Sequence, residues 1–269
     1  MTGRERAVAI AAGVAAGFFG GLFGVGGGIV LVPLLTGRLH VTQHQAHGTS
    51  LAVIGVTALV SVIVYALHGN VAWLTALIVG VASAFSARWG ARLASTISGV
   101  ALGRAFAVFL GVVALRLLLA PAPPRTLIAG PWGIALSLVL GLAVGVLSGF
   151  MGVGGGILAV PAFTLLMGMT QQMAQGTSLA VILCAAPAGA REHSRRGNVV
   201  MRVVPWLALG AALGGPLSSW WVQRLPRDLL SRAFGVFLIV NGVWTWIRAG
   251  RRTRLASARS GERRQNART

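Results

Sequence analysis

The chain has 269 residues, of which 55% are hydrophobic and 10% are charged, and its mean hydropathy is +0.79. Soluble domains carry about 25% charged residues, so this composition excludes an ordinary soluble protein and predicts an all-α polytopic membrane protein. The net charge of +19 comes from arginine alone, and eight arginines lie between Arg248 and Arg268. A basic tail after the last apolar segment is typical of a cytoplasmic terminus, so we expect no nucleic-acid partner.

Apolar stretches of spanning length follow one another along the whole chain. Such stretches predict helices, because in lipid only a helix satisfies its own backbone N–H and C=O groups without pairing to another segment. In chain order they occupy residues 7–35, 46–67, 71–90, 100–119, 132–166, 174–190, 199–222 and 230–247. The sequence therefore predicts about eight transmembrane helices.

These segments fall into two groups of four, because one motif occurs twice at an offset of 128 residues. Residues 17–33 read GFFGGLFGVGGGIVLVP, and residues 145–161 read GVLSGFMGVGGGILAVP. At the same offset, HGTSLAVI at 47–54 matches QGTSLAVI at 175–182. Duplicated membrane transporters often build one site between their repeats, near the midplane, and we expect two homologous repeats that share a site.

The domain boundaries follow from the repeat. We expect a first repeat at 1–120, a proline-rich linker at 121–131, a second repeat at 132–248, and a disordered basic tail at 249–269. If the first and fifth segments dip into the membrane and return, the halves are inverted and 18 arginines lie inside against 5 outside; full crossings give 16 against 7. Excess positive charge on the cytoplasmic side favours inverted repeats, and both arrangements place both termini in the cytoplasm.

Each copy of the repeated motif holds four glycines in five positions. Glycine costs an α-helix about 1 kcal/mol relative to alanine, so the two glycine runs are expected to break the first and fifth helices. The N–H groups freed at the start of the next half-helix form an anion site without formal charge. The candidate binding residues are Gly26, Gly27, Gly28, Gly154, Gly155 and Gly156. Close helix packing is the alternative, although it needs glycine on only one face.

A second set of polar residues begins the segment that follows each glycine run. Hydroxyls and first-turn N–H groups at a helix start can bind a ligand, and helix capping is the alternative. The candidates are His47, Thr49, Ser50, Gln175, Thr177 and Ser178. Histidine alone among them gains charge near neutral pH, which predicts a pH-sensitive first copy. Weaker candidates are Asn70 and Asn198, expected mainly as helix N-caps, and Cys184, expected mainly in core packing.

Acidic residues are almost absent. The only four are Glu5, Glu192, Asp228 and Glu262, all outside the predicted membrane segments. No carboxylate is therefore available inside the membrane to relay protons, to hold a metal ion or to act as a catalytic base. We expect neither an enzyme nor a metal or cofactor site.

The doubled Gly-x-Gly-Gly-Gly-Ile, each followed by Gly-Thr-Ser-Leu-Ala, resembles the TauE/SafE sulfite exporter family, also called the toluene sulfonate uptake permease family. The resemblance covers about residues 7–247. It implies an eight-span permease of the bacterial inner membrane for sulfite, thiosulfate or organosulfonates, with the glycine runs and the Gly-Thr-Ser sites along the anion path.

These observations lead us to expect a secondary permease for a small sulfur-containing oxyanion that works by alternating access. Membrane lipid is an expected partner, and a homodimer is left open. A passive anion channel of the same architecture is the alternative. A structural or signalling membrane subunit is a third possibility, which would show no substrate-dependent flux.

Overall fold

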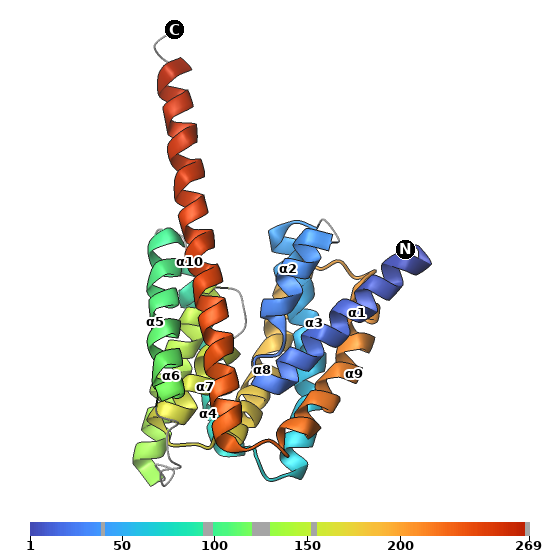
Figure 1. The fold of residues 1–269 in the computed structure, drawn as a ribbon, viewed down its shortest axis with the longest axis vertical. Helices are drawn as coiled ribbons and strands as arrows, with labels where there is room; N and C mark the ends of the chain where they lie inside the picture. The colour runs from blue at the N-terminus through green and yellow to red at the C-terminus, as the bar shows by residue number, and fades with distance from the viewer. Residues whose placement is uncertain (39–40, 94–98, 120–129, 152–154, 267–269) are drawn as a thin grey trace. The chain divides into compact units, whose positions relative to one another are not determined.

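The computed structural model describes residues 1–38, 41–93, 99–119, 130–151 and 155–266, and these residues form ten helices and no strand (Figure 1). The helices are α1 (Gly3–Phe23), α2 (Gly28–Arg38), α3 (Gln43–Leu67), α4 (Trp73–Leu93), α5 (Gly99–Leu119), α6 (Gly130–Met151), α7 (Gly156–Leu166), α8 (Gln171–Arg195), α9 (Val204–Val222) and α10 (Arg227–Asn266). The predicted all-helical class is confirmed.

Among the described residues, five helical stretches are long and apolar enough to cross a membrane. They are Gly3–Phe23, Gln45–Leu67, Gly130–Ser148, Gln171–Arg195 and Arg227–Ile247. Shorter apolar helices occur at Gly28–Gly37, Trp73–Ala87 and Gly156–Leu166. These lengths agree with a polytopic membrane protein, and the count of eight spans stays a prediction.

The chain divides into two compact units that do not follow the two halves of the sequence. The first unit comprises Met1–Ala91 and Ala122–Arg227, and the second comprises Arg92–Pro121 and Asp228–Thr269. Each unit therefore takes corresponding helices from both halves.

In the first unit, α1 and α2 form a helical hairpin around the first glycine run (Figure 1). The turn needs glycine, because Gly24, Gly26 and Gly27 have φ of 69°, 74° and 86°, a region that other residues rarely adopt. A methyl group on Gly27 would also collide with the Ala16 carbonyl of α1. The break predicted from the glycine run is present, and α2 turns back along α1.

The first predicted segment of each half packs closely on the third predicted segment of the other half, so that α1 packs on α9 and α6 packs on α4. Glycines at every fourth position of α1 let its backbone approach α9: Gly13 contacts the Leu207 carbonyl, and Gly17 contacts Ala211. The same contacts recur between α6 and α4, 128 residues away, where Gly141 meets Val79. The halves are thus interlocked.

Helices α3 and α8, which correspond to the second predicted segment of each half, lie antiparallel. Gly48, near the start of α3, meets Asn198 just after the end of α8, and Gly176, near the start of α8, meets Asn70 just after the end of α3. The two contacts are related by the 128-residue offset. Equivalent helices of the two halves therefore run in opposite directions in this pair.

The second unit is built from α5 and α10, which correspond to the fourth predicted segment of each half. Methyl groups on Gly235 and Gly242 of α10 would lie 3.3 Å from the carbonyl oxygens of Ala114 and Ala107 of α5, so these helices are antiparallel as well. Helix α10 continues to Asn266, through most of the tail for which the sequence suggested disorder. Arginine and alanine have high helix propensity, and this stretch contains no proline.

We predict that Gly17→Ala weakens the contact between α1 and α9. The added methyl group would lie 2.5 Å from the Ala211 carbonyl oxygen and 2.7 Å from its Cα, so the backbones must separate. Overpacking of this kind costs roughly 1–3 kcal/mol. Gly111→Ala is the matched control, because no heavy atom lies within 4 Å of its methyl position. Thermal unfolding in detergent should separate the two variants, and equal melting temperatures would contradict the packing described here.

Candidate functional site

The two glycine runs meet inside the first unit. A methyl group on Gly156, the first residue of α7, would lie 2.8 Å from the Val25 Cα and 2.9 Å from the Gly24 carbonyl oxygen. Ile54 of α3 and Ile182 of α8, which occupy equivalent positions in the two halves, both contact Gly26. The helix breaks in the first and fifth predicted segments are therefore in contact with each other.

The first N–H groups of two helices lie where the runs meet. The N–H groups at the start of a helix have no acceptor within that helix, and here they belong to Gly28 and Ile29 of α2 and to Gly156 and Ile157 of α7. They begin α2 and α7, whose helix dipoles place a partial positive charge at these N-termini. Two half-helix N-termini thus converge on one place, an arrangement that favours an anion.

Ser178 of α8 and Tyr65 of α3 bond to backbone carbonyls in and just before the first glycine run. The Ser178 hydroxyl donates to the Gly24 carbonyl at 2.8 Å. The Tyr65 hydroxyl lies 2.9 Å from the Gly21 carbonyl oxygen and 3.1 Å from Gln175 Oε1, and its single proton can be donated to either acceptor. Gln175 is fully buried, and its Nε2 has no partner among the described residues. This amide donor is available to a ligand beside the glycine run.

The equivalent residues of the first half differ in chemistry. Ser50 is buried, and its hydroxyl has no partner among the described residues. His47 is half-buried and precedes Gly48, whose methyl position would lie 3.0 Å from the His193 Cβ. His193 occupies the position that corresponds to Tyr65. One end of the α3–α8 pair therefore carries a tyrosine and a glutamine, and the other end carries two histidines.

The two threonines serve a structural role. Thr49 accepts a hydrogen bond from the Val200 N–H, and Thr177 accepts one from the Ala72 N–H, both at 3.0 Å. Both threonines are fully buried. Their hydroxyls satisfy buried donors of the other half, so they join the halves.

The predicted position of the Gly-Thr-Ser motifs at helix starts is wrong. Helices α3 and α8 begin earlier, at the N-caps Thr42 and Thr170, whose side chains accept from the N–H groups of Gln45 and Met173. Thr42 and Gln45 form a capping box, a signal that was present in the sequence. The motifs therefore lie in the second turn, where their N–H groups join the helix ladder.

The predicted N-cap role of Asn70 and Asn198 is also wrong. Their N–H groups bond to the carbonyls of Tyr65 and His193 at 2.9 Å, and each follows a glycine with φ near 70°. These are Schellman motifs, in which a left-handed glycine ends the preceding helix. Asn70 Nδ2 additionally donates to Gln223 Oε1 at 2.6 Å.

Two further candidates lie apart from the glycine contact or outside the described residues. Cys184 is exposed on α8, and a methyl group on Gly80 of α4 would lie 3.0 Å from its Cβ. The expected burial of Cys184 in the core is therefore wrong. Gly154 lies outside the described residues, while Gly155 is the N-cap of α7 and Gly156 its first residue.

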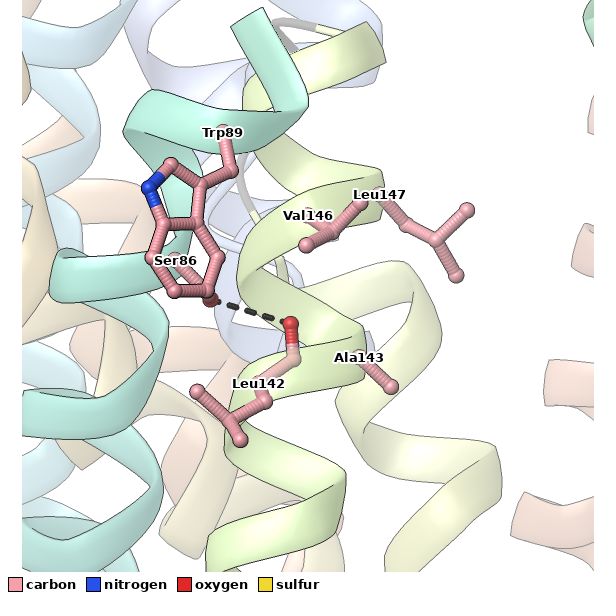
Figure 2. A pocket seen from close by; sticks show the side chains of 6 residues that line it. All are labelled: Ser86, Trp89, Leu142, Ala143, Val146 and Leu147. Carbon is pink, nitrogen blue, oxygen red and sulfur yellow. Dashed lines mark hydrogen bonds between the residues drawn. The ribbon is translucent and has the colours of Figure 1, made fainter. Parts of the chain in front are cut away.

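A groove of about 360 Å³ between α4 and α6 is a poor place for an oxyanion (Figure 2). Its hydroxyl, that of Ser86, donates to the Leu142 carbonyl at 2.9 Å. The other lining residues are apolar: Trp89, Leu142, Ala143, Val146 and Leu147. Apart from the indole N–H of Trp89, such a lining offers an anion no further side-chain donor, and it suits hydrocarbon instead.

Comparison with known proteins places the chain in a family. The family model described as sulfite exporter TauE/SafE matches residues 2–117 and 137–269. The chain belongs to the TauE/SafE sulfite exporter family. A probable membrane transporter protein of Xylella fastidiosa (strain Temecula1) is 30% identical over 253 residues, which cover 91% of this chain and 96% of that protein. The probable membrane transporter protein YunE of Bacillus subtilis (strain 168) is 30% identical over 259 residues, covering 87% and 95%. No solved structure matches the chain.

Membership of the TauE/SafE family makes this protein a membrane transporter. One residue at its glycine contact escaped the sequence analysis. Tyr65, the only tyrosine, is fully buried and joins α3 to α1 and α8. A lone tyrosine near the end of an apolar segment is a usable signal, because a buried phenol needs a hydrogen-bond partner.

We predict that the two described glycines of the second run respond differently to substitution in this TauE/SafE transporter. In Gly156→Ala the methyl group meets the Val25 and Gly24 backbone at 2.8–2.9 Å, which must move the two runs apart. In Gly155→Ala it meets the Val144 Cγ1 atom at 2.6 Å, and a side chain can rotate away. Thermal unfolding and uptake into proteoliposomes should show loss in Gly156→Ala and near wild-type behaviour in Gly155→Ala. Equal loss in both variants would contradict this reading of the contact.

Proposed function

We propose that this chain is a secondary permease for a small oxyanion, which binds where the N-termini of α2 and α7 meet. The carrying observation is the contact of Gly156 with Val25 and Gly24, which brings the N-terminus of α7 to the glycine run that precedes α2. The proposed ligands are the N–H groups of these two helix starts and the buried Nε2 of Gln175.

Electrostatics supports an anion that is held without a formal positive charge nearby. Each helix N-terminus carries roughly half an elementary positive charge, and two N-termini that face one ion compensate about one negative charge. Neutral donors also avoid the cost of burying an unpaired arginine in the membrane. Because the bound anion forms no full ion pair, its release is not opposed by one. A carrier needs such release at the end of each transport cycle.

The family name supports sulfur chemistry for the substrate. We propose sulfite, thiosulfate or an organosulfonate as the transported anion, each of which offers several oxygen acceptors to converging N–H donors. Membrane lipid covers the apolar outer faces, and no enzymatic step is part of this proposal.

Alternating access in this fold must respect the interlocked packing. Rocking one sequence half against the other as rigid bodies would separate α1 from α9 and α3 from α8. We therefore propose that these pairs stay together while access changes at the two ends of the α3–α8 pair. Inverted repeats would make the two ends equivalent in backbone, as in other transporters of this kind.

The topology can be tested with cysteines at the exposed C-caps of α3 and α8. In a Cys184→Ser background, His68→Cys and Arg196→Cys are expected to react with a membrane-impermeant maleimide from opposite sides of the membrane, because α3 and α8 are antiparallel. Arg196→Cys should share its side with the basic tail. Labelling of both positions from one side would overturn the inverted arrangement.

The function is tested by counterflow into proteoliposomes with sulfite, thiosulfate, taurine, sulfoacetate and sulfate. A carrier should show saturable exchange, whereas the alternative anion channel should conduct continuously without countertransport. Gln175→Leu, which removes the amide donor, is expected to weaken anion affinity by about tenfold. Asn241→Leu is the matched control, a buried amide of α10 that bonds to the Phe237 carbonyl. Unchanged affinity in Gln175→Leu would remove Gln175 from the site, and no flux of any anion would refute the permease.

A further inference from the structure

Two side-chain hydrogen bonds hold the segment that follows α9. Asn70, in the turn between α3 and α4, donates from its Nδ2 to Gln223 Oε1 at 2.6 Å. Gln172, in the first turn of α8, donates from its Nε2 to the Leu225 carbonyl at 3.3 Å. Residues 223–225 are therefore bonded both to the turn after α3 and to the start of α8. We call the side chains of Asn70, Gln172 and Gln223 the amide clamp.

Gln223 is fixed in its orientation by its own helix. Its Nε2 donates to the Ser219 carbonyl of α9 at 3.2 Å, which leaves Oε1 as the acceptor for Asn70. The backbone turns directly afterwards, because the Leu225 N–H donates to the Val222 carbonyl at 3.1 Å. The clamp thus has a defined geometry on both sides of residues 223–225.

The amide clamp lies next to a group of fully buried side chains at the same end of the bundle: Tyr65, Gln175 and Ser219. Each clamp residue is about one turn away from one of them. The Asn70 N–H bonds to the Tyr65 carbonyl, and Gln172 precedes Gln175 on α8. Solvent does not reach these buried side chains, so this end of the bundle, the tyrosine end, is closed in the structure.

The clamp is built from bonds that can open. Asn70 and Gln223 are only half-buried and neutral, so water can replace each as a partner at a small net cost. Helix α9 ends at Val222. The residues after it can therefore move without separating α9 from α1, the contact that alternating access has to preserve.

Unpaired amide atoms in the first turn of α8 limit the stability of the closed arrangement. Gln171 is 3% exposed, and neither its Nε2 nor its Oε1 has a partner among the described residues. Gln172 Oε1 lacks one as well. Buried polar groups are almost always paired, so each of these atoms gains a partner when water enters. The closed end is thus balanced against an open one.

The chemistry of the clamp is not repeated in the first half of the sequence. At the offset of 128 residues, Ser95 corresponds to Gln223 and His44 corresponds to Gln172. Neither residue type carries the carboxamide that makes the two clamp bonds. The histidine end of the α3–α8 pair must therefore close through other contacts.

We propose that the amide clamp is the gate of the tyrosine end, an inference that rests on the proposed function. When the bonds from Asn70 and Gln172 break, residues 223–226 move away and open a path to Gln175 and the glycine contact. A carrier needs both states of this end in every cycle. The strength of the clamp then sets the fraction of time for which the tyrosine end is open.

The labelling rate of a buried cysteine measures this open fraction. The reporter is Ser219→Cys in a Cys184→Ser background of the full-length protein, treated in vesicles with a membrane-impermeant thiosulfonate from the side of the tyrosine end. Asn70→Ala and Gln172→Leu are each expected to raise the labelling rate about fivefold, which corresponds to one neutral hydrogen bond. Asn241→Ala is the matched control, because this amide of α10 bonds to the Phe237 carbonyl of its own helix.

A second reporter separates opening of the gate from general loosening. Ser50→Cys, buried at the histidine end, should label more slowly in the clamp variants, because a carrier that opens one end closes the other. Combining Asn70→Ala with Gln223→Ala should raise the rate no further than the larger single effect, since these side chains share one bond. Gel filtration and thermal unfolding establish that each variant is folded.

Unchanged labelling of Ser219→Cys in both clamp variants would overturn the gate, and so would an equal rise in Asn241→Ala. Faster labelling of both reporters would overturn it as well, because the bundle would then be loosened throughout. The permease has a separate readout, which is anion counterflow. Counterflow with unchanged labelling would overturn the gate and leave the permease standing. Faster labelling of Ser219→Cys alone, without flux of any anion, would refute the permease and retain the opening of this end.

Discussion

Every backbone polar group of a membrane helix must find a partner within the protein, and the first N–H groups of α2 and α7 have none within their own helices. These helix starts lie inside the protein because the glycine runs meet, with Gly156 against Gly24 and Val25 and with Ile54 and Ile182 beside Gly26. Protein rather than lipid thus surrounds them. The α1–α2 hairpin and the candidate site both depend on this contact.

Close backbone approach at glycine explains why the two sequence halves do not form two domains. Gly13 and Gly17 bring α1 onto α9, and Gly48 and Gly176 bring α3 and α8 together. Side chains at these positions would hold the helices apart. Each half therefore completes the other, and the glycine contact contains backbone from both.

The ends of the α3–α8 pair share a backbone plan and differ in chemistry. Tyr65 and Gln175 occupy one end, and His193 and His47 occupy the other. Of the buried serine hydroxyls without a partner among the described residues, those of Ser61 and Ser219 lie on the tyrosine side and that of Ser50 lies on the histidine side. Such differences suit a protein whose two ends face different compartments.

Composition, the 128-residue repeat and the glycine runs were sufficient to predict helices, the break at Gly24–Gly28 and the family, because hydropathy and helix propensity act locally. Local patterns failed for Gly-Thr-Ser and for Asn70, where caps at Thr42 and at a left-handed glycine set the true helix ends. Only tertiary structure could show that Gly156 meets Gly24 or that Tyr65 reaches Gln175, which is 110 residues away. Helix pairing depends on which backbones can approach, and that is a property of two surfaces rather than of one segment.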